Sequence, residues 1–165
     1  MGIFDKVRGI ADATIDIIGS VKNAKYKGKK LAKEEFNLLG MSYFEDNFPK
    51  LMDSNQEFKS LKKTIKKNGH VGKRIFKYKY TELNARLSFN EGKPYTRFQV
   101  FAKNLSVGYI KEEDHSRIKF ILDNDCTDSM NVKLSGGEFR IIGNDDSDMK
   151  SDIGYKAKLI VTYYK

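Results

Sequence analysis

Near the start of the chain, apolar residues recur at the spacing of one broad helical face. They are Ile3, Phe4, Val7, Ile10, Ala11, Ile15, Ile17, Ile18 and Val21, and the opposite face carries Asp5, Arg8, Asp12 and Asp16. Residues 22–33 follow with six lysines and no acidic residue. The pattern predicts an amphipathic helix and a basic linker over residues 1–34, ahead of a folded domain over residues 35–165.

Two short elements are predicted at the beginning of that domain. The first is a buried strand of three apolar residues that stops at a glycine, where the chain reverses: Phe36, Leu38 and Leu39, then Gly40. The second is a short helix indicated by apolar residues at helical spacing: Phe58, Leu61 and Ile65. Asn68 and Gly69 follow in the way that helices often end.

After Gly72 the spacing changes to that of strands, with aromatic and β-branched residues enriched. Residues 73–90 and 95–104 predict a hairpin across the turn sequence NEGKP. Residues 107–124 begin as a strand and continue as a helix with an acidic first turn. Further on, residues 130–143 predict a second hairpin that turns at its two adjacent glycines, Gly136 and Gly137. An acidic loop over residues 144–152 precedes a closing strand over residues 154–165.

Several short strands with one helix between them favour a small closed or nearly closed antiparallel β-barrel. We therefore expect an α+β fold that is mainly β, with an inserted helix and an N-terminal amphipathic helix. A chain of 165 residues suffices for one such domain and a short appendage.

Cysteine usage and hydropathy suggest the compartment. Cys126 is the single cysteine, so it has no partner for an internal disulfide or a thiolate metal cluster. The chain shows no signal-peptide pattern and no apolar run long enough for a membrane span. We expect a protein of the reducing cytoplasm.

The formal net charge of +9 favours polyanionic partners, either nucleic acid or an acidic membrane surface. An amphipathic helix followed by a polybasic run suits a membrane surface or a protein partner that docks on residues 3–33. The same helix also suits packing on its own domain or on a second copy, with the lysines as a solvated linker. Composition does not choose between these alternatives.

The sequence offers little catalytic chemistry. His70 and His115 are the two candidate bases at neutral pH, and His115 and Ser116 are helix neighbours that do not face each other as a base and a nucleophile must. The acidic loop lacks the spacing, the central Gly and the terminal Glu of a calcium-binding EF-hand loop. Neither a Walker A sequence nor GxGxxG is found. We expect a protein that is not an enzyme and that has no metal or cofactor.

Aromatic residues alternate with cations in residues 74–80 and again around positions 93–97 and 109–111. Residues 49–80 hold ten Lys and Arg against two acidic residues, a local balance of +8. Single-stranded nucleic acid is bound by aromatic faces that stack on bases and by cations that neutralise phosphates. In any strand one alternate set of side chains faces the core, so part of this pattern is expected to be buried.

Four segments, taken in order, resemble the HIRAN domain family: FNLLGMSYF, ARLSFNEGKPYTRFQVFAKNLSVGYIKEEDHSRIKFILDN, LSGGEFRIIG and GYKAKLIVTYY. The resemblance covers roughly residues 36–165 and leaves residues 47–73 as an insertion. HIRAN domains have an OB-like barrel, occur in DNA-repair proteins and in bacterial and phage proteins, and bind single-stranded DNA at its 3′ end. The resemblance therefore implies an OB-like barrel that binds single-stranded DNA or DNA ends.

Carried over by this resemblance, four aromatic positions contact bases or sugars: Tyr43, Tyr95, Tyr109 and Tyr155. The cations expected at phosphates are Lys93, Arg97 and Lys111. Three positions depart from the family, since Ser42 stands where the best-known members have Arg, Lys93 replaces an Asn, and Thr96 replaces the Asp that accepts the 3′-hydroxyl proton. A neutral Thr makes a weaker hydrogen bond than a carboxylate does. Whether the preference for a free 3′ end is kept stays open.

Overall fold

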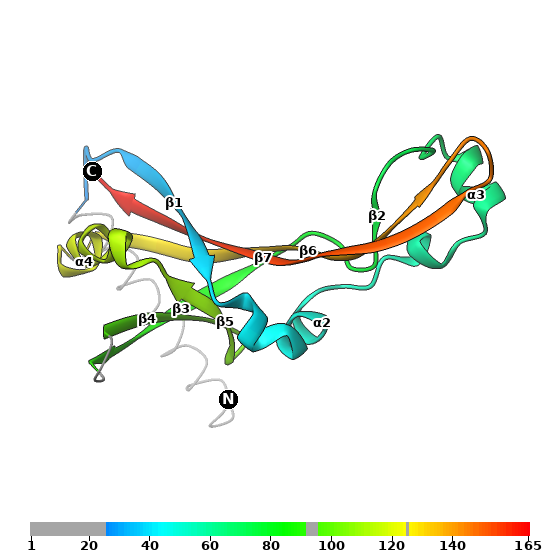
Figure 1. Cartoon of the computed structure of the whole chain (residues 1–165). Helices are drawn as coiled ribbons and strands as arrows, with labels where there is room; N and C mark the ends of the chain where they lie inside the picture. The colour runs from blue at the N-terminus through cyan, green and yellow to red at the C-terminus, as the bar shows by residue number, and fades with distance from the viewer. Residues whose placement is uncertain (1–25, 92–95, 125) are drawn as a thin grey trace, which may run out of the picture. The chain divides into compact units, whose positions relative to one another are not determined.

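A computed structural model describes residues 26–91, 96–124 and 126–165 (Figure 1). The strands are β1 (Leu31–Leu39), β2 (Ile75–Phe76), β3 (Thr81–Glu91), β4 (Thr96–Ala102), β5 (Leu105–Ile110), β6 (Thr127–Ile142) and β7 (Asp148–Tyr164). The α-helices are α2 (Phe48–Leu51), α3 (Lys62–Lys67) and α4 (His115–Asp123). Short 3-10 helices form η1 (Met41–Asn47), η2 (Gln56–Lys59) and η3 (Glu112–Asp114).

Six of the strands close an antiparallel barrel in the order β6-β3-β4-β5-β1-β7, because β7 pairs again with β6. The long strand β3 joins the two halves: its first residues pair with β6, with Thr81 opposite Leu134, and its later residues pair with β4, with Ala85 opposite Ala102. Helix α4 connects β5 to β6. The expected mainly β, OB-like barrel with an inserted helix is confirmed.

The barrel core is built from aliphatic side chains on β4 to β7 and on α4. Those with no exposed surface are Val100, Val107, Ile118, Ile121, Val132, Leu134, Leu159 and Val161. Each such burial contributes roughly 1.5–3 kcal/mol relative to an exposed side chain. The strand-to-helix reading of residues 107–124 is confirmed, because Ile118 and Ile121 place one face of α4 in the core.

The prediction of a buried strand that stops at Gly40 is correct in part. Phe36 and Leu38 are buried and the strand stops before Gly40, as expected. Leu39, however, is 50% exposed, because successive side chains of a strand point to opposite faces. The strand also begins at Leu31, so part of the predicted basic linker belongs to the sheet.

The predicted turn at Gly136 and Gly137 is wrong. Both residues lie inside β6, at an irregularity in its pairing with β7 between Gly136 and Glu138. A Cβ on Gly136 would lie 2.3 Å from the carbonyl oxygen of Gly154, so the two strands approach too closely there for a side chain. The reversal falls instead at residues 143–147, and β7 already begins at Asp148 within the expected acidic loop.

The far end of the β6–β7 hairpin carries η2, α3 and β2, and these elements form a small core of their own: Phe58, Ile65, Ile75 and Ile142 (Figure 1). The predicted helix over residues 58–65 is interrupted at Leu61, which is 77% exposed and caps α3. Gly69, with a φ of 72°, ends α3 as predicted. Of the elements at this end, η2 and α3 fall within residues 47–73, the segment that the resemblance left as an insertion.

Arg140 fastens this end of the hairpin. Its Nε and Nη2 donate to the Asp148 carboxylate at 2.9 and 3.0 Å, and its Nη1 donates to the carbonyl oxygens of Phe58 and Ser60 at 2.9 and 2.8 Å. The side chain is buried, so these bonds satisfy a guanidinium removed from water. Asp148 and η2 are thereby held on β6.

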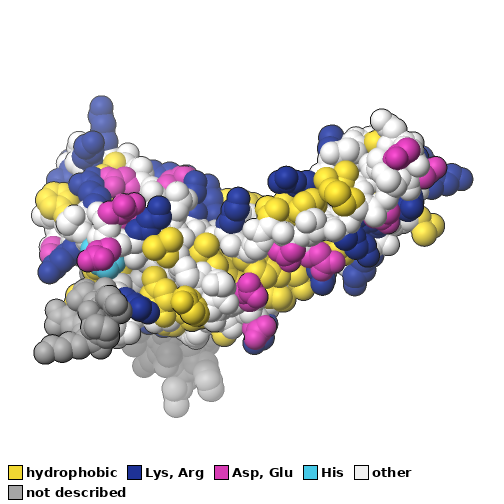
Figure 2. Space-filling view, in the orientation of Figure 1, with side chains coloured by type: hydrophobic (Ala, Val, Ile, Leu, Met, Phe, Trp, Pro, Cys, Tyr) yellow, Lys and Arg dark blue, Asp and Glu magenta, His cyan; other side chains and the backbone are white. Residues whose placement is uncertain are grey.

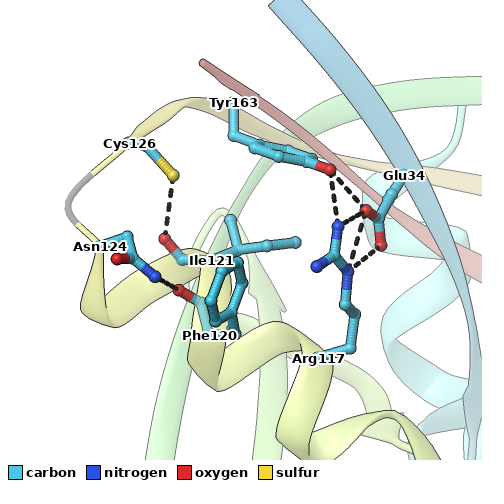
Figure 3. A network of polar contacts seen from close by, with 7 residues as sticks. All are labelled: Glu34, Arg117, Phe120, Ile121, Asn124, Cys126 and Tyr163. Carbon is cyan, nitrogen blue, oxygen red and sulfur yellow. Dashed lines mark hydrogen bonds and ion pairs between the residues drawn. The ribbon is translucent and has the colours of Figure 1, made fainter. Parts of the chain in front are cut away.

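At the opposite end, Arg117 of α4 connects the helix to two strands (Figure 3). Its Nε donates to both carboxylate oxygens of Glu34 in β1 at 3.0 and 2.9 Å, and its Nη2 donates to the Tyr163 hydroxyl of β7 at 2.7 Å. The hydrogen bond with Glu34 raises the pKa of Arg117. Cys126 is buried and its thiol donates to the Ile121 carbonyl at 3.4 Å.

The described residues divide into two compact units, residues 26–32 with 164–165, and residues 33–163. In the first unit, the rings of Tyr26 and Tyr164 stack with centroids 4.3 Å apart. The predicted amphipathic helix lies outside the described residues. Of the helices that the structure describes, none has the length and apolar character needed to cross a membrane.

Candidate nucleic-acid interface

Two of the predicted aromatic residues meet beside Gly40, where β1 gives way to η1. The glycine has a φ of 75°, and a Cβ at this position would lie 3.0 Å from Cδ2 of Tyr109 and 3.3 Å from Cδ2 of Tyr43. Tyr43 is 81% exposed, whereas Tyr109 is half-buried. The left-handed glycine therefore lets one ring from β5 and one from η1 lie together.

Arg97 and Phe44 complete this cluster. The Arg97 guanidinium carbon lies 5.0 Å from the centroid of the Tyr109 ring, within the range of a cation–π contact. On the η1 side, the Phe44 ring lies 5.5 Å from Tyr109, tilted by 52°. The register of β4 against β5 makes the Arg97 contact possible, since Tyr109 is opposite Gln99, two residues from Arg97. We call Tyr43, Phe44, Arg97 and Tyr109 the Tyr109 platform.

Gly108 fixes the position of Tyr109 on β5. Gly108 and Tyr109 both lie within the strand, near its end, as the sequence pattern predicted. A Cβ on Gly108 would lie 2.9 Å from the Leu39 carbonyl oxygen and 3.1 Å from the Leu38 Cβ. The glycine therefore permits the close approach of β1 to β5 that brings η1 beside Tyr109.

Two further predicted residues are close in sequence to residues of the platform. Ser42 is exposed in η1, next to Tyr43. Lys111 follows β5, and its Nζ lies 3.6 Å from a carboxylate oxygen of Glu113, which is largely exposed. A solvent-exposed ion pair of this kind contributes little, so an incoming phosphate can compete with Glu113 for the amine.

Tyr155 belongs to a different cluster. Its ring stacks on the buried Phe48 of α2 at 4.6 Å and lies 6.5 Å from the ring of Tyr78. A Cβ on Gly137 would lie 2.6 Å from the same ring, so this glycine makes room for it. Burial raises the pKa of Tyr155, which keeps its hydroxyl neutral. Tyr155 thus packs partly into the core, and its aromatic neighbours are Phe48 and Tyr78.

Three predicted contacts remain predictions. Lys93 and Tyr95 lie outside the described residues, and Thr96 is the first residue of β4, where the structure describes the backbone. The hairpin that they connect is confirmed for β3 and β4, since Glu91 pairs with Thr96. Its predicted first strand over residues 73–90 is divided, because β3 begins at Thr81 and Ile75–Phe76 form β2, which pairs with β6.

A second surface lies along β6 and was not among the predicted sites. It consists of two hollows, of about 370 and 490 Å³, that share Tyr80 in their linings. The first is lined by Asn55, Glu57, His70, Lys73, Arg74, Ile75, Phe76, Tyr78, Lys79 and Tyr80, and the second by Asn37, Tyr80, Lys133, Ser135, Lys156, Ala157 and Lys158. We call the two together the Tyr80 groove. On the face displayed in Figure 2, Lys and Arg side chains lie beside hydrophobic ones along the β6–β7 hairpin, and acidic side chains lie among them.

The sequence signal for this surface was partial. The alternation of cations and aromatics over residues 74–80 suggested contacts with nucleic acid, and most of these residues line the first hollow. Lys133, Lys156 and Lys158 lie far from that segment in sequence and join it only because of strand register, which sets Lys133 opposite Lys158 and Ser135 opposite Lys156. Successive side chains of a strand point to opposite faces, and Leu134 and Leu159 are buried. This alternation was the signal in the sequence that the neighbouring lysines face outward.

Both histidines have structural partners. His115 Nε2 lies 3.1 Å from the Ile110 carbonyl oxygen, and the centroid of its ring lies 5.1 Å from that of Phe98, with the two rings nearly perpendicular. His70 Nδ1 lies 2.5 Å from the Glu57 carboxylate at the first hollow of the groove. Among the described residues, no cluster of three His, Cys, Asp or Glu side chains is placed to hold a metal ion.

Comparisons of the chain with protein-family models, with curated proteins and with solved structures found no match.

Proposed function

We propose that this protein is a non-enzymatic module that binds single-stranded nucleic acid, with the Tyr109 platform stacking on the bases. The observation that carries the proposal is the Arg97–Tyr109 contact beside Tyr43, a residue that is 81% exposed. An aromatic ring so exposed offers a free face to a ligand, and base stacking on such a ring contributes roughly 1–3 kcal/mol per base. The net charge of +9 supports a polyanionic ligand.

A single strand fits this platform better than a duplex. In a duplex the base faces are stacked on one another, and exposing one costs a few kcal/mol. In a single strand the faces are available to Tyr43 and Tyr109, while Arg97 can meet a phosphate from its place over the ring. The order of motifs and the OB-like barrel also support our proposal that the chain is a divergent HIRAN-type domain.

The test is fluorescence anisotropy with a labelled single strand and a duplex of the same sequence. We expect tighter binding of the single strand. Tyr43→Ala and Tyr109→Ala should each weaken it by roughly 5-fold to 150-fold, which corresponds to one lost base stack. Phe120→Ala is the matched control, because Phe120 is also an exposed aromatic residue under an arginine, on α4. Equal binding of duplex and single strand, with no effect of Tyr109→Ala, would refute the proposal.

The same assay tests the expectation about DNA ends. Strands with a 3′-hydroxyl and with a 3′-phosphate should bind with similar affinity, because Thr96 stands where a carboxylate would read the hydroxyl. A strong preference for the free hydroxyl that Thr96→Val abolishes would show instead that Thr96 replaces the carboxylate in function.

A further inference from the structure

The Tyr80 groove has the composition of a polyanion site. Three of its lysines are exposed and make no ion pair with any residue that the structure describes: Lys73, Lys79 and Lys156. Two other lysines share one acid, since Lys158 Nζ lies 2.8 Å and Lys133 Nζ lies 3.7 Å from the Glu35 carboxylate. The groove therefore carries more positive charge than its own carboxylates neutralise.

Tyr80 lies where the two hollows of the groove meet. Tyr80 is 59% exposed and lines both hollows. Partial burial lowers the pKa of Lys133. A hydrogen bond with the Tyr80 hydroxyl and the charge of the nearby Glu35 raise it, and the net effect is a raised pKa. Lys133 therefore stays charged and is linked to the most exposed aromatic side chain of the groove.

We propose that the Tyr80 groove is a second contact for the nucleic acid, one that binds the phosphate backbone of the strand whose bases stack on the Tyr109 platform; to that extent it rests on the proposed function. Cations alternating with half-exposed aromatics in a hollow suit a flexible strand that enters it. A flat anionic membrane surface would reach the rim of such hollows and leave Tyr78 without a contact.

One segment of the chain links the two surfaces. Phe44 of η1 contacts Tyr109 in the platform, and Phe48 of the adjoining α2 stacks on Tyr155. The Tyr155 ring in turn lies beside Tyr78, which lines the groove. A strand that occupies both surfaces would therefore pass over η1 and α2, which are continuous in the chain.

The probe that separates the groove from the platform is an abasic oligonucleotide, which has phosphodiesters and no bases to stack. We compare the full-length protein with a groove variant that combines Lys73→Gln, Lys79→Gln and Lys156→Gln. The control variant removes the same charge from exposed lysines of α3 and α4 outside the groove: Lys63→Gln, Lys67→Gln and Lys119→Gln. Circular dichroism and thermal melting verify that both variants fold.

The expected result is that the groove variant loses affinity for the abasic strand while the control variant retains it. The slope of log K against log salt should become shallower by about 2 in the groove variant, since about 0.7 is lost for each single-strand phosphate contact. An equal loss in both variants would mean bulk electrostatics and would overturn the proposal. Binding to vesicles that contain anionic lipid, without binding to the abasic strand, would overturn it in favour of a membrane surface.

The two proposals fail separately. Tyr109→Ala should weaken binding of the strand with bases and leave binding of the abasic strand unchanged. If Tyr109→Ala changes the affinity for neither strand, but the groove variant binds both the abasic strand and the strand with bases more weakly, the platform is refuted and the groove proposal is supported. If the groove variant binds the abasic strand as the wild type does, the groove is refuted whatever Tyr109→Ala does.

Discussion

The guanidinium carbon of Arg97 lies 5.0 Å from the centre of the Tyr109 ring, across the pairing of β4 with β5. A second pair of the same kind lies nearby in the sheet, because Arg86 of β3 lies 4.8 Å from the ring centre of Phe101 on β4. The two pairs have similar geometry, but one of them is part of the platform. Comparing them separates a binding role from a packing role.

Arg97→Gln should therefore weaken binding of single-stranded DNA, whereas Arg86→Gln should not. If Arg97 meets one phosphate, the salt slope becomes shallower by about 0.7. Anisotropy titrations at several salt concentrations give both quantities. An equal decrease in the two variants would show that Arg97 contributes only its share of the net charge.

Two glycines test the irregular pairing of β6 with β7. Alanine at either Gly136 or Gly154 has to adopt a positive φ, which costs about 1–2 kcal/mol. A Cβ on Gly136 also meets the Gly154 carbonyl oxygen at 2.3 Å, whereas a Cβ on Gly154 meets no atom within 4 Å. Gly136→Ala should lower the free energy of unfolding by about 1–3 kcal/mol more than Gly154→Ala does. Denaturant titrations measure the difference, and equal losses would contradict the close approach.

The Arg140–Asp148 pair predicts a pH dependence of stability. Hydrogen bonds from Arg140 hold the pKa of Asp148 below its ordinary value. The folded state therefore favours the carboxylate more than the unfolded state does, and this stabilisation is complete above the ordinary Asp pKa and is lost as the pH falls through the lowered pKa. Asp148→Asn should melt at a lower temperature than wild type at neutral pH, and the gap should narrow below about pH 4.

The control for that measurement is Asp123→Asn, which changes an exposed carboxylate at the end of α4. Its melting temperature should follow that of the wild type across the same range. A gap between Asp148→Asn and wild type that stays constant down to low pH would show that the ion pair does not cause it.

The position of β1 makes a prediction about truncation. Removing residues 1–25 leaves every described element in place and should keep the affinity for single-stranded DNA. Removing residues 1–34 deletes the start of β1 and the Glu34 partner of Arg117, so the melting temperature should fall. Binding of vesicles or of a protein partner that is lost after removal of residues 1–25, in a full-length chain that does not bind DNA, would favour the alternative in which that segment docks on a membrane or a partner.

Much of the fold was predictable because it depends on local patterns. The strand that ends at Gly40, the hairpin of β3 and β4, and the helix after β5 follow from hydrophobic spacing and turn residues. The error at Gly136 and Gly137 has a physical cause. A glycine pair serves equally for a turn and for a close contact between strands, and the difference depends on Gly154 across the hairpin.

The candidate site was predictable only in part. Tyr43, Arg97 and Tyr109 were expected to act together, and the structure places Tyr43 and Tyr109 beside Gly40 and Arg97 over the Tyr109 ring. Tyr155 was expected beside them, but it packs on Phe48, because a large ring next to Gly137 gains more from burial than from exposure. No local pattern distinguishes an aromatic residue that stacks on a ligand from one that fills a gap in the core.

The sequence by itself determined the class of fold, the order of most elements and the excess of positive charge, since these depend on composition and on spacing along the chain. The tertiary structure alone decided where the charge gathers. Lys133, Lys156 and Lys158 reach one groove with Tyr80 through the register of β6 and β7. Register is fixed by which side chains the closed barrel buries, and that choice involves all of the strands at once.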